Sequence, residues 1–384
     1  MALVHDFLID LRGAERVFSE LCRMWPEAEI FTPIYDARGT DGRFEGRTIH
    51  TSFLQRLRPT ARTFRSLLPL YPSAIESFDF SGYDLVLSSS SAWAHAVLVD
   101  EGTTHVCYCH NPFRYAWNDR TQTLARQRNP ITRAILRAAF HRWRQWDWIA
   151  AQRTDRYIAN SRTTQGRIRT YFGREASIIH PPVETDRFTP GAVGDHYAVV
   201  SELMAHKRID VAVEAFNQLG RPLTVVGDGP ELRHLRRTAG QSITFTGRLD
   251  DHGVAQVMQQ ARALVISSVE EFGLTAVEAQ AAGRPVIALG VGGALETVRD
   301  GVTGRLWTGT AAELAAAVRE FDDASIDPRA CVENAASFDT QTFRAKLRAE
   351  LDRALTGAAR APEPSRRPLA TTRLIRRAAR NGGQ

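Results

Sequence analysis

The 384-residue sequence contains only four cysteines, Cys22, Cys107, Cys109 and Cys331, and none of them forms a C-x-x-C pair. A zinc clip is therefore not expected, whereas reduced and buried thiols are. No apolar run approaches the roughly 18 residues that a membrane span needs. The first residues, MALVHDF, carry neither a basic leader nor a long apolar stretch, so we expect no signal peptide and a cytoplasmic protein.

Acidic residues are scarce at the C-terminal end. The formal net charge is +6, and residues 357–384 contain seven arginines but a single glutamate. The excess positive charge thus belongs to this tail, and no nucleic-acid partner is predicted. Because the tail is rich in Ala, Pro and Arg, it also predicts disorder. It serves either as a peripheral contact with the anionic inner face of the plasma membrane or as a solubilising end.

The rest of the sequence alternates short apolar runs with amphipathic stretches, a pattern typical of parallel sheets covered by helices. The length predicts two domains, and a hydrophobic content of 43% supplies enough material for two cores. We place the first domain at residues 1–182 and the second at 183–338, followed by a closing helix at 339–356 and the tail at 357–384. The prolines of HPPVETDRFTP, residues 180–190, mark the crossing between the domains.

Strands are expected at 2–4, 84–88, 97–99, 105–109, 156–159 and 177–179 in the first domain, and at 197–201, 223–226, 243–246, 264–267 and 285–289 in the second. Expected helices include 14–24, 131–152, 209–219, 231–238, 254–261, 275–282 and 340–355. In sheets of this kind, ligands bind where strands end and helices begin.

The segment from Leu264 to Leu289 carries the most informative pattern, a buried strand followed by the loop SVEEFG and a helix. Gly273 lets the backbone approach a ligand, and the first N–H groups of the helix lack partners within it, which favours a diphosphate. Glu270 and Glu278 can both reach the same crevice. Each also has a structural interpretation, since Thr275 to Glu278 reads as a capping box and Glu270 as a solvated loop carboxylate.

The pattern E-x-F-G-L-x-x-x-E-A-x-x-x-G-x-P-V, which runs from Glu270 to Val286, resembles the signature of glycosyltransferase family 4. The segments VVGDGPE, FTGRLDD and GVGGALETVRDGVTG resemble neighbouring loops of that family. In the first half, HDFL, RGAERV and YCHNPFRYAW look like a subgroup that contains O-antigen mannosyltransferases. The resemblance covers nearly the whole chain except the tail. It implies the GT-B fold, in which two Rossmann-like α/β domains face each other across a cleft.

The resemblance also implies a role for individual residues. The amides of Leu274 and Thr275 would hold the donor diphosphate, Glu278 the ribose and Glu270 the hydroxyls of the donor sugar. The remaining implied contacts are Gly247, Arg248 and Leu249 at the base, Phe272 and Gly273 in the signature loop, Gly13 at the phosphates, His110 beside the reacting sugar and Arg114 on the acceptor side.

Lys207 and Arg208 stand just before an expected helix, where they can neutralise the charge of a leaving phosphate. They could equally be a solvated pair of charges. The family commonly has S-R-L where this chain has Ser201-Glu202-Leu203, and a carboxylate beside a diphosphate would repel it. Either Glu202 turns away and Arg208 or Arg12 substitutes for the missing arginine, or the donor is handled differently.

The segment FHRWRQWDW, residues 140–148, interleaves aromatic and basic residues. It predicts either contact with bases or a membrane, or a helix that packs its tryptophans inward.

No D-x-D metal clamp occurs, so we expect neither a metal nor another cofactor. The sequence thus predicts a retaining glycosyltransferase that moves a hexose, mannose from GDP-mannose, from a nucleotide-diphosphate sugar to a glycan or lipid-linked acceptor in cell-surface polysaccharide synthesis. The alternatives are a non-catalytic sugar-nucleotide-binding partner of another transferase and a sugar-nucleotide epimerase with the GT-B fold.

Overall fold

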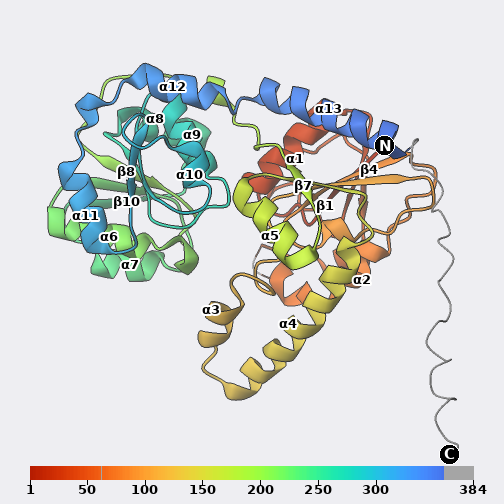
Figure 1. Ribbon diagram of the computed structural model, residues 1–384. Helices are drawn as coiled ribbons and strands as arrows, with labels where there is room; N and C mark the ends of the chain where they lie inside the picture. The colour runs from red at the N-terminus through yellow and green to blue at the C-terminus, as the bar shows by residue number, and fades with distance from the viewer. Residues whose placement is uncertain (62, 359–384) are drawn as a thin grey trace, which may run out of the picture.

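The computed structural model describes residues 1–61 and 63–358, which form two α/β domains side by side (Figure 1). Each domain is built on a parallel sheet with a separate hydrophobic cluster on either face. This arrangement confirms the predicted fold class. Within the described ranges, no helix combines the length and apolar character that crossing a membrane requires. The predicted basic tail lies outside these ranges apart from its first two residues.

The first domain holds a seven-stranded sheet in the order β3-β2-β1-β4-β5-β6-β7, and each strand pairs in parallel with its neighbours. Its strands are β1 (Ala2–His5), β2 (Glu29–Thr32), β3 (Ile49–Thr51), β4 (Leu85–Ser90), β5 (Thr104–Cys109), β6 (Arg156–Ala159) and β7 (Ala176–Ile178). The second domain holds a six-stranded parallel sheet in the order β10-β9-β8-β11-β12-β13. Its strands are β8 (Tyr197–Val200), β9 (Leu223–Val226), β10 (Ile243–Gly247), β11 (Leu264–Ile266), β12 (Val286–Leu289) and β13 (Gly304–Trp307).

Helices connect the strands in both domains. Those of the first are α1 (Gly13–Met24), η1 (Phe53–Leu57), η2 (Phe64–Leu70), α2 (Tyr71–Glu76), η3 (Ala94–Ala96), α3 (Arg120–Ala125), α4 (Pro130–Ala151) and α5 (Arg162–Phe172). Those of the second are η4 (Thr185–Arg187), η5 (Ala205–Lys207), α6 (Ile209–Leu219), α7 (Leu232–Thr238), α8 (Asp251–Gln260), α9 (Leu274–Ala281), α10 (Ala294–Thr297), α11 (Ala311–Glu320), η6 (Asp323–Ser325) and α12 (Pro328–Ala336).

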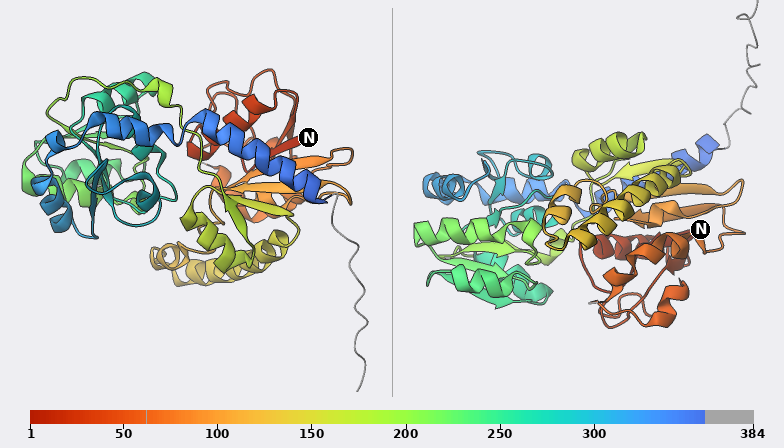
Figure 2. Two further views of the ribbon diagram at one scale, coloured as in Figure 1. Left: turned by 45° about the horizontal axis from the view of Figure 1, so that its top comes forward. Right: turned by 90° about the horizontal axis from the view of Figure 1, so that it is seen from below.

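The last helix, α13 (Thr340–Ala358), returns to the first domain and lies across it (Figure 2). Phe343 and Leu347 are buried in the same cluster as Leu3 and Tyr108. The chain therefore crosses twice between the domains, and the crossings touch, because the N–H of Val183 donates to the carbonyl of Phe338 at 3.0 Å. The first domain is thus completed by the end of the described chain.

The expected strand at 97–99 is wrong. After β4 the chain turns through η3 and continues without regular structure, because the Asp6 carboxylate accepts hydrogen bonds from four consecutive backbone N–H groups, those of residues 91–94. A side chain directly after β1 thus fixes the turn that the apolar sequence alone suggests as a strand. The short strands β2, β3 and β13 were not among the strands expected from the sequence.

The segment 140–148 packs mostly inward. It lies within α4, and Phe140 is 2% exposed. Trp143 and Trp146 pack against the cluster that contains Trp93, whereas Trp148 is half exposed. The inward alternative therefore holds for most of this segment.

Candidate functional site

The signature carboxylate Glu270 forms an ion pair with Lys207. Lys207 Nζ donates to both carboxylate oxygens, at 2.8 and 2.7 Å, and the Ser268 hydroxyl donates to Oε1 at 2.5 Å. Burial opposes ionisation of Glu270, but the ammonium of Lys207 and these hydrogen bonds outweigh it, so its pKa is lowered. The structure thus unites two residues that lie 63 positions apart, and Glu270 is not a solvated loop carboxylate.

Glu271 was not predicted as a site residue, yet it joins the two domains. Its Oε1 accepts from Arg114 Nη2 at 2.8 Å and from Arg167 Nη1 at 2.9 Å, and both arginines belong to the first domain. Arg167 also donates to the side chain of Asn111 at 2.6 Å, directly after His110. The doubled glutamate in SVEEFG is a sequence signal for this residue, but nothing local in TTQGRIRT marks Arg167. Arg114 therefore stands at the interface between the domains.

Helix α9 begins at the site with Gly273 as its N-cap, whose φ of 95° lies in the left-handed region that favours glycine. No side chain caps this helix, so the predicted capping box from Thr275 to Glu278 is wrong: Thr275 already lies inside the helix. The start of α1 adjoins the same place, since a Cβ added at Gly13 would lie 3.1 Å from Leu274 Cδ1. Two helix N-termini, each with partner-free N–H groups, therefore converge here.

Phe272 serves packing. It is 3% exposed and stacks on His180 with ring centroids 5.3 Å apart. Its side chain thus supports the loop that carries Glu270 from within the core.

Glu278 is half-buried on α9. Burial raises its pKa, and the opposing fields of Arg187 and Arg16 do not fully compensate. Because the expected capping box does not form, the Glu278 carboxylate does not cap α9. A carboxylate held near cations at the interface remains available to accept hydrogen bonds from a ligand.

The residues predicted at the base lie at the end of β10. Gly247 closes the strand with a φ of 76°, and the exposed Arg248 reaches Asp10 of the first domain at 3.3 Å. Leu249 is half-buried beside Gly253. Arg208 points elsewhere, since its Nη2 donates to the carbonyl of Gly309 at 2.6 Å. The structure therefore groups Lys207 with Glu270 but does not bring Arg208 to them.

Glu202 is neutralised by Arg12. Arg12 Nη2 lies 3.3 Å from Glu202 Oε1 across the domain interface, and its Nε lies 3.2 Å from Asp10 Oδ2. Burial would lower the pKa of Arg12, but the field of Glu202 and its other carboxylate neighbours raises it overall. Of the alternatives drawn from the sequence, Arg12 is the arginine that stands beside Glu202.

His110 lies directly after β5, and its imidazole is buried. Its Nε2 and the Ser89 hydroxyl are 2.8 Å apart. Burial, assisted by the nearby His5, lowers the pKa of His110 to about 3, so the imidazole is neutral. A neutral imidazole at this position can orient a hydroxyl group but cannot carry charge.

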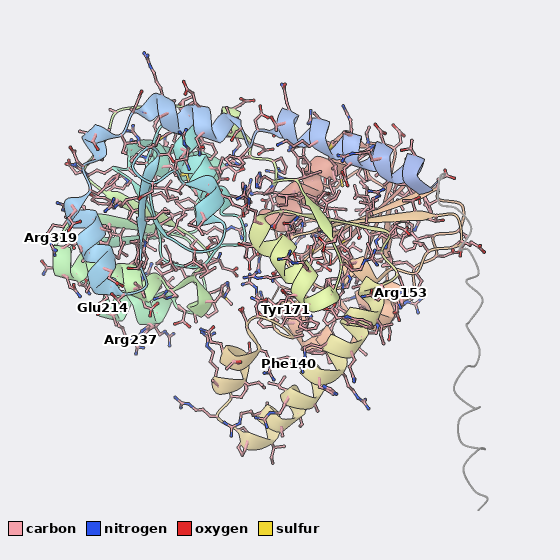
Figure 3. The ribbon with its side chains drawn as sticks, viewed as in Figure 1. Phe140, Arg153, Tyr171, Glu214, Arg237 and Arg319 are labelled. Atoms are coloured by element: carbon pink, nitrogen blue, oxygen red, sulfur yellow. The ribbon has the colours of Figure 1, made fainter. Side chains whose placement is uncertain are left out.

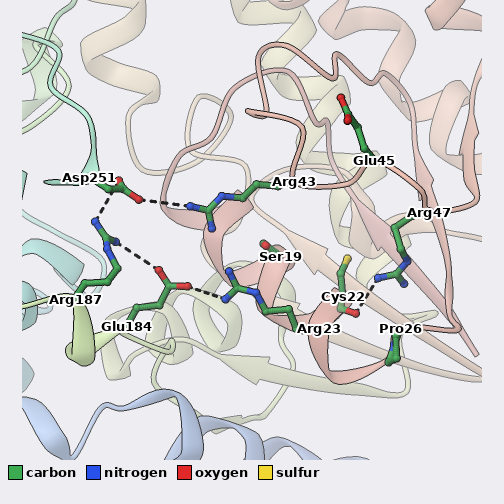
Figure 4. Close-up of a pocket in the computed structure, with 10 residues that line it drawn as sticks. All are labelled: Ser19, Cys22, Arg23, Pro26, Arg43, Glu45, Arg47, Glu184, Arg187 and Asp251. Carbon is green, nitrogen blue, oxygen red and sulfur yellow. Dashed lines mark hydrogen bonds and ion pairs between the residues drawn. The ribbon is translucent and has the colours of Figure 1, made fainter.

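A cavity of about 500 Å³ opens between the domains (Figure 4). Arginines from α1, the 43–47 loop and η4 line it, together with Asp251. Asp251 pairs with Arg16 at 2.6 Å and with Arg187 at 3.2 Å. None of the residues predicted from the sequence lines this cavity. Within the described ranges, no cluster of three or more His, Cys, Asp or Glu side chains could hold a metal ion.

Comparison with known proteins agrees with this geometry. A family model described as Glycosyltransferase Family 4 matches residues 11–187, and one described as Glycosyl transferases group 1 matches residues 195–322. The two matches divide the chain as the two domains do. The chain therefore carries the two domains that these glycosyltransferase family models describe. Residues 188–194, directly after η4, separate the two matched ranges.

Among curated relatives, this chain is 34% identical over 203 residues to a GDP-mannose-dependent alpha-(1-6)-phosphatidylinositol monomannoside mannosyltransferase of Mycolicibacterium smegmatis, over 44% of this chain and 52% of the relative. It is 32% identical over 231 residues to a D-inositol 3-phosphate glycosyltransferase of Mycobacterium leprae, over 52% of this chain and 54% of the relative. The chain thus spans about half the length of the curated relatives it matches.

Two solved structures resemble the whole fold. Anabaena HepE in complex with UDP-glucose matches with a TM-score of 0.67 at 19% identity, over 91% of this chain and 99% of that one. Sucrose-phosphate synthase from Thermosynechococcus elongatus matches with a TM-score of 0.69 at 19% identity, over 93% and 100%. These matches establish the GT-B fold.

Proposed function

We propose that this glycosyltransferase moves a hexose from a nucleotide-diphosphate sugar to a glycan or lipid-linked acceptor with retention of anomeric configuration. The observation that carries the proposal is the ion pair between Lys207 and Glu270, held beside the uncapped N-terminus of α9. A diphosphate would bring negative charge to that terminus and compete with Glu270 for Lys207. Glu270 would then be free to accept hydrogen bonds from the hydroxyls of the donor sugar.

Charge on the leaving diphosphate would be met by fixed groups. The N–H groups at the start of α9 and the Lys207 ammonium are already oriented, so little reorganisation is needed during the reaction. In front-side attack, the acceptor oxygen forms a bond to the anomeric carbon on the face that the phosphate leaves, and the departing phosphate takes the acceptor proton. Neither a metal nor another cofactor enters this scheme.

We propose GDP-mannose as the donor and cell-surface polysaccharide synthesis as the setting. Support comes from the M. smegmatis relative, whose name describes it as GDP-mannose-dependent. The HepE structure was solved with UDP-glucose, so the family fold accommodates more than one base and sugar.

The decisive experiment offers the purified protein a panel of labelled nucleotide sugars, with and without EDTA, and measures transfer and slow donor hydrolysis. We expect turnover with GDP-mannose, unaffected by EDTA, and at least a hundredfold loss in Glu270→Gln. If none of the donors is turned over, the proposal that this protein is an enzyme is refuted. Donor binding without turnover would favour the non-catalytic partner, and release of an epimerised sugar would favour the epimerase.

We also propose that the glycosyltransferase meets its acceptor at an anionic membrane, through the arm formed by α3 and α4. This arm extends from the first domain (Figures 1 and 3). From Arg120 to Trp146 the sequence contains seven arginines and no acidic residue. Such a segment is attracted to anionic lipid, by about 1 kcal/mol for each arginine near the surface.

The arm also exposes apolar side chains. Ile131, Ile135 and Ile149 are 69%, 64% and 55% exposed. They share one face of α4, because Ile131 and Ile149 are separated by five helical turns and Ile135 lies about one turn from Ile131. An apolar stripe bordered by arginines fits the interface between headgroups and acyl chains.

Vesicle sedimentation tests this membrane contact. We expect salt-sensitive binding to phosphatidylglycerol-containing vesicles that is lost in Arg133→Glu/Arg137→Glu, whereas the same double reversal at Arg236 and Arg237 on exposed α7 preserves it. Deletion after Thr356 measures the contribution of the tail separately. Equal binding by both double variants would refute a role for the arm.

A further inference from the structure

Four side chains form a buried polar chain that runs from His110 to the start of α1. His110 Nε2 lies 2.8 Å from the Ser89 hydroxyl, and the same hydroxyl lies 3.1 Å from His5 Nδ1. On the far side, His5 Nε2 lies 3.6 Å from Glu15 Oε1. All four side chains are buried: Ser89, His5 and Glu15 belong to β4, β1 and α1, and His110 directly follows β5. The proposed reaction does not by itself require so long a chain.

The proton count gives this chain a direction. The other oxygen of Glu15 accepts the backbone N–H of Arg12 at 3.0 Å, and a carboxylate can only accept hydrogen bonds. At 3.6 Å the Glu15 carboxylate makes no hydrogen bond to His5, but its charge favours a proton on His5 Nε2, and in a neutral imidazole Nδ1 is then the acceptor. The hydroxyl proton of Ser89 would then point to His5, and the Ser89 oxygen would accept from His110 Nε2.

The remaining ring nitrogen of His110 faces outward. Within the described ranges, Nδ1 of His110 has no hydrogen-bond partner. It is not among the fully buried side-chain atoms without a partner, so this nitrogen is accessible to solvent. The backbone of His110 is held on both sides: its N–H donates to Ser90, and its carbonyl accepts from Thr164. The imidazole is thus anchored by Nε2, and within the described ranges Nδ1 is left without a protein partner.

We propose that Glu15, His5 and Ser89 are positioning residues that fix His110 as the Nε2–H tautomer, so that its unprotonated Nδ1 accepts a hydrogen bond from a sugar hydroxyl. The identity of the ligand rests on the proposed function, whereas the tautomer does not. The neutral state imposed on His110 by burial agrees with this arrangement. The same carboxylate caps α1, whose N-terminus adjoins α9, so one residue serves both the phosphate side and the sugar side of the site.

Glu15→Gln should reverse the donor and acceptor roles in the hydrogen bonds that connect His5, Ser89 and His110. The Arg12 N–H requires the single amide oxygen, and glutamine maintains a capping box as well as glutamate does. The amide NH₂ then faces His5 Nε2 and makes it an acceptor. His5 consequently donates through Nδ1 to Ser89, Ser89 donates to His110 Nε2, and His110 presents Nδ1–H instead of a lone pair.

A matched control exists in the second domain. Glu313 of α11 forms the same capping box with Thr310 but is exposed and contacts no histidine. Glu313→Gln therefore alters an equivalent helix cap without altering the series of side chains from Glu15 to His110.

The test reads the tautomer of His110 by ¹⁵N NMR of histidine-labelled protein, with the resonance assigned through His110→Ala. We expect Nε2–H in the wild type and in Glu313→Gln, Nδ1–H in Glu15→Gln, and a mixture in Ser89→Ala, which breaks the chain without touching the cap. An Nδ1–H tautomer in the wild type, or an unchanged tautomer in both Glu15→Gln and Ser89→Ala, would overturn the proposal.

Binding and kinetics supply the second readout. We expect Glu15→Gln to lower kcat/KM for the donor sugar about 10- to 100-fold, as loss of an orienting partner commonly does. Affinity for the nucleoside diphosphate alone should stay unchanged, because no sugar hydroxyl is present. If no donor is turned over, the proposed function fails while the tautomer result stands on its own. If the tautomer changes but donor kinetics do not, the role in sugar binding is refuted.

Discussion

Lys207→Met should destabilise the second domain in a pH-dependent way. The two side chains of the pair with Glu270 are 21% and 18% exposed, and the closest N–O distance is 2.7 Å. Coulomb's law with an effective dielectric constant of about 20 gives roughly 6 kcal/mol for such a contact, before desolvation is subtracted. Breaking a buried pair on one side commonly costs about 3–5 kcal/mol. Because both groups are partly exposed, we expect a loss of about 3 kcal/mol at pH 7.

How the destabilisation by Lys207→Met changes with pH follows from the lowered pKa of Glu270. In the wild type, the ionised carboxylate stabilises the fold above its ordinary pKa, and this contribution disappears as pH falls through the lowered value. Without Lys207, burial is opposed only by the hydrogen bond from Ser268 and the weaker field of Arg114, so the pKa of Glu270 should rise. The carboxylate of the variant then takes up a proton as pH falls below neutral, which relieves the penalty. The difference in unfolding free energy between wild type and variant should therefore shrink from pH 7 to pH 5.

Urea unfolding followed by circular dichroism at both pH values measures this difference. The control is Lys207→Met/Glu270→Gln, which removes the buried charge and should recover most of the loss at pH 7. An equal loss at both pH values, or a double variant no more stable than the single one, would refute the reasoning.

Three further predictions follow from the same interface. Glu278→Gln should slightly stabilise the protein above pH 5, because the raised pKa shows that its ionised form is disfavoured by folding; calorimetry should also show about tenfold weaker donor binding. Gly13→Ala should leave the melting temperature unchanged, since the Leu274 methyl 3.1 Å away can move, yet lower donor kcat/KM several-fold because the added methyl group and the moved Leu274 side chain crowd the start of α9. Glu271→Gln should weaken the hold of Arg114 and Arg167 and raise the radius of gyration in small-angle scattering.

The sequence predicted most of the fold because its elements obey local rules. Alternating strands and helices place the second domain from β8 to β12 to within three residues, since β9, α6 and α7 follow apolar periods and end at glycine or polar residues, whereas the elements from α10 to α12 were not predicted. The wrong strand at 97–99 and the wrong capping box at Thr275 share a cause. In each, a distant or backbone interaction decides: the Asp6 carboxylate in the first, and Gly273 as the true N-cap in the second.

The site was predictable only where the motif is contiguous. Glu270, Gly273 and Glu278 lie in one recognisable segment, and their neighbourhood follows from it. Arg167 was not predictable, because it reaches the interface through tertiary packing across 104 positions. The partner of Glu202 remained open for the same reason, until Arg12 was placed opposite it.

The contact between the two crossings has a mechanical consequence. Val183 and Phe338 hold both connections at one edge of the interface, so they form a single pivot and not two separated hinges. Rotation about that pivot would strain contacts across the interface such as the one between Arg114 and Glu271. Because the first domain needs α13, a nascent chain can fold its second domain before its first is complete. The interface between the domains would then be assembled late, once α13 has left the ribosome.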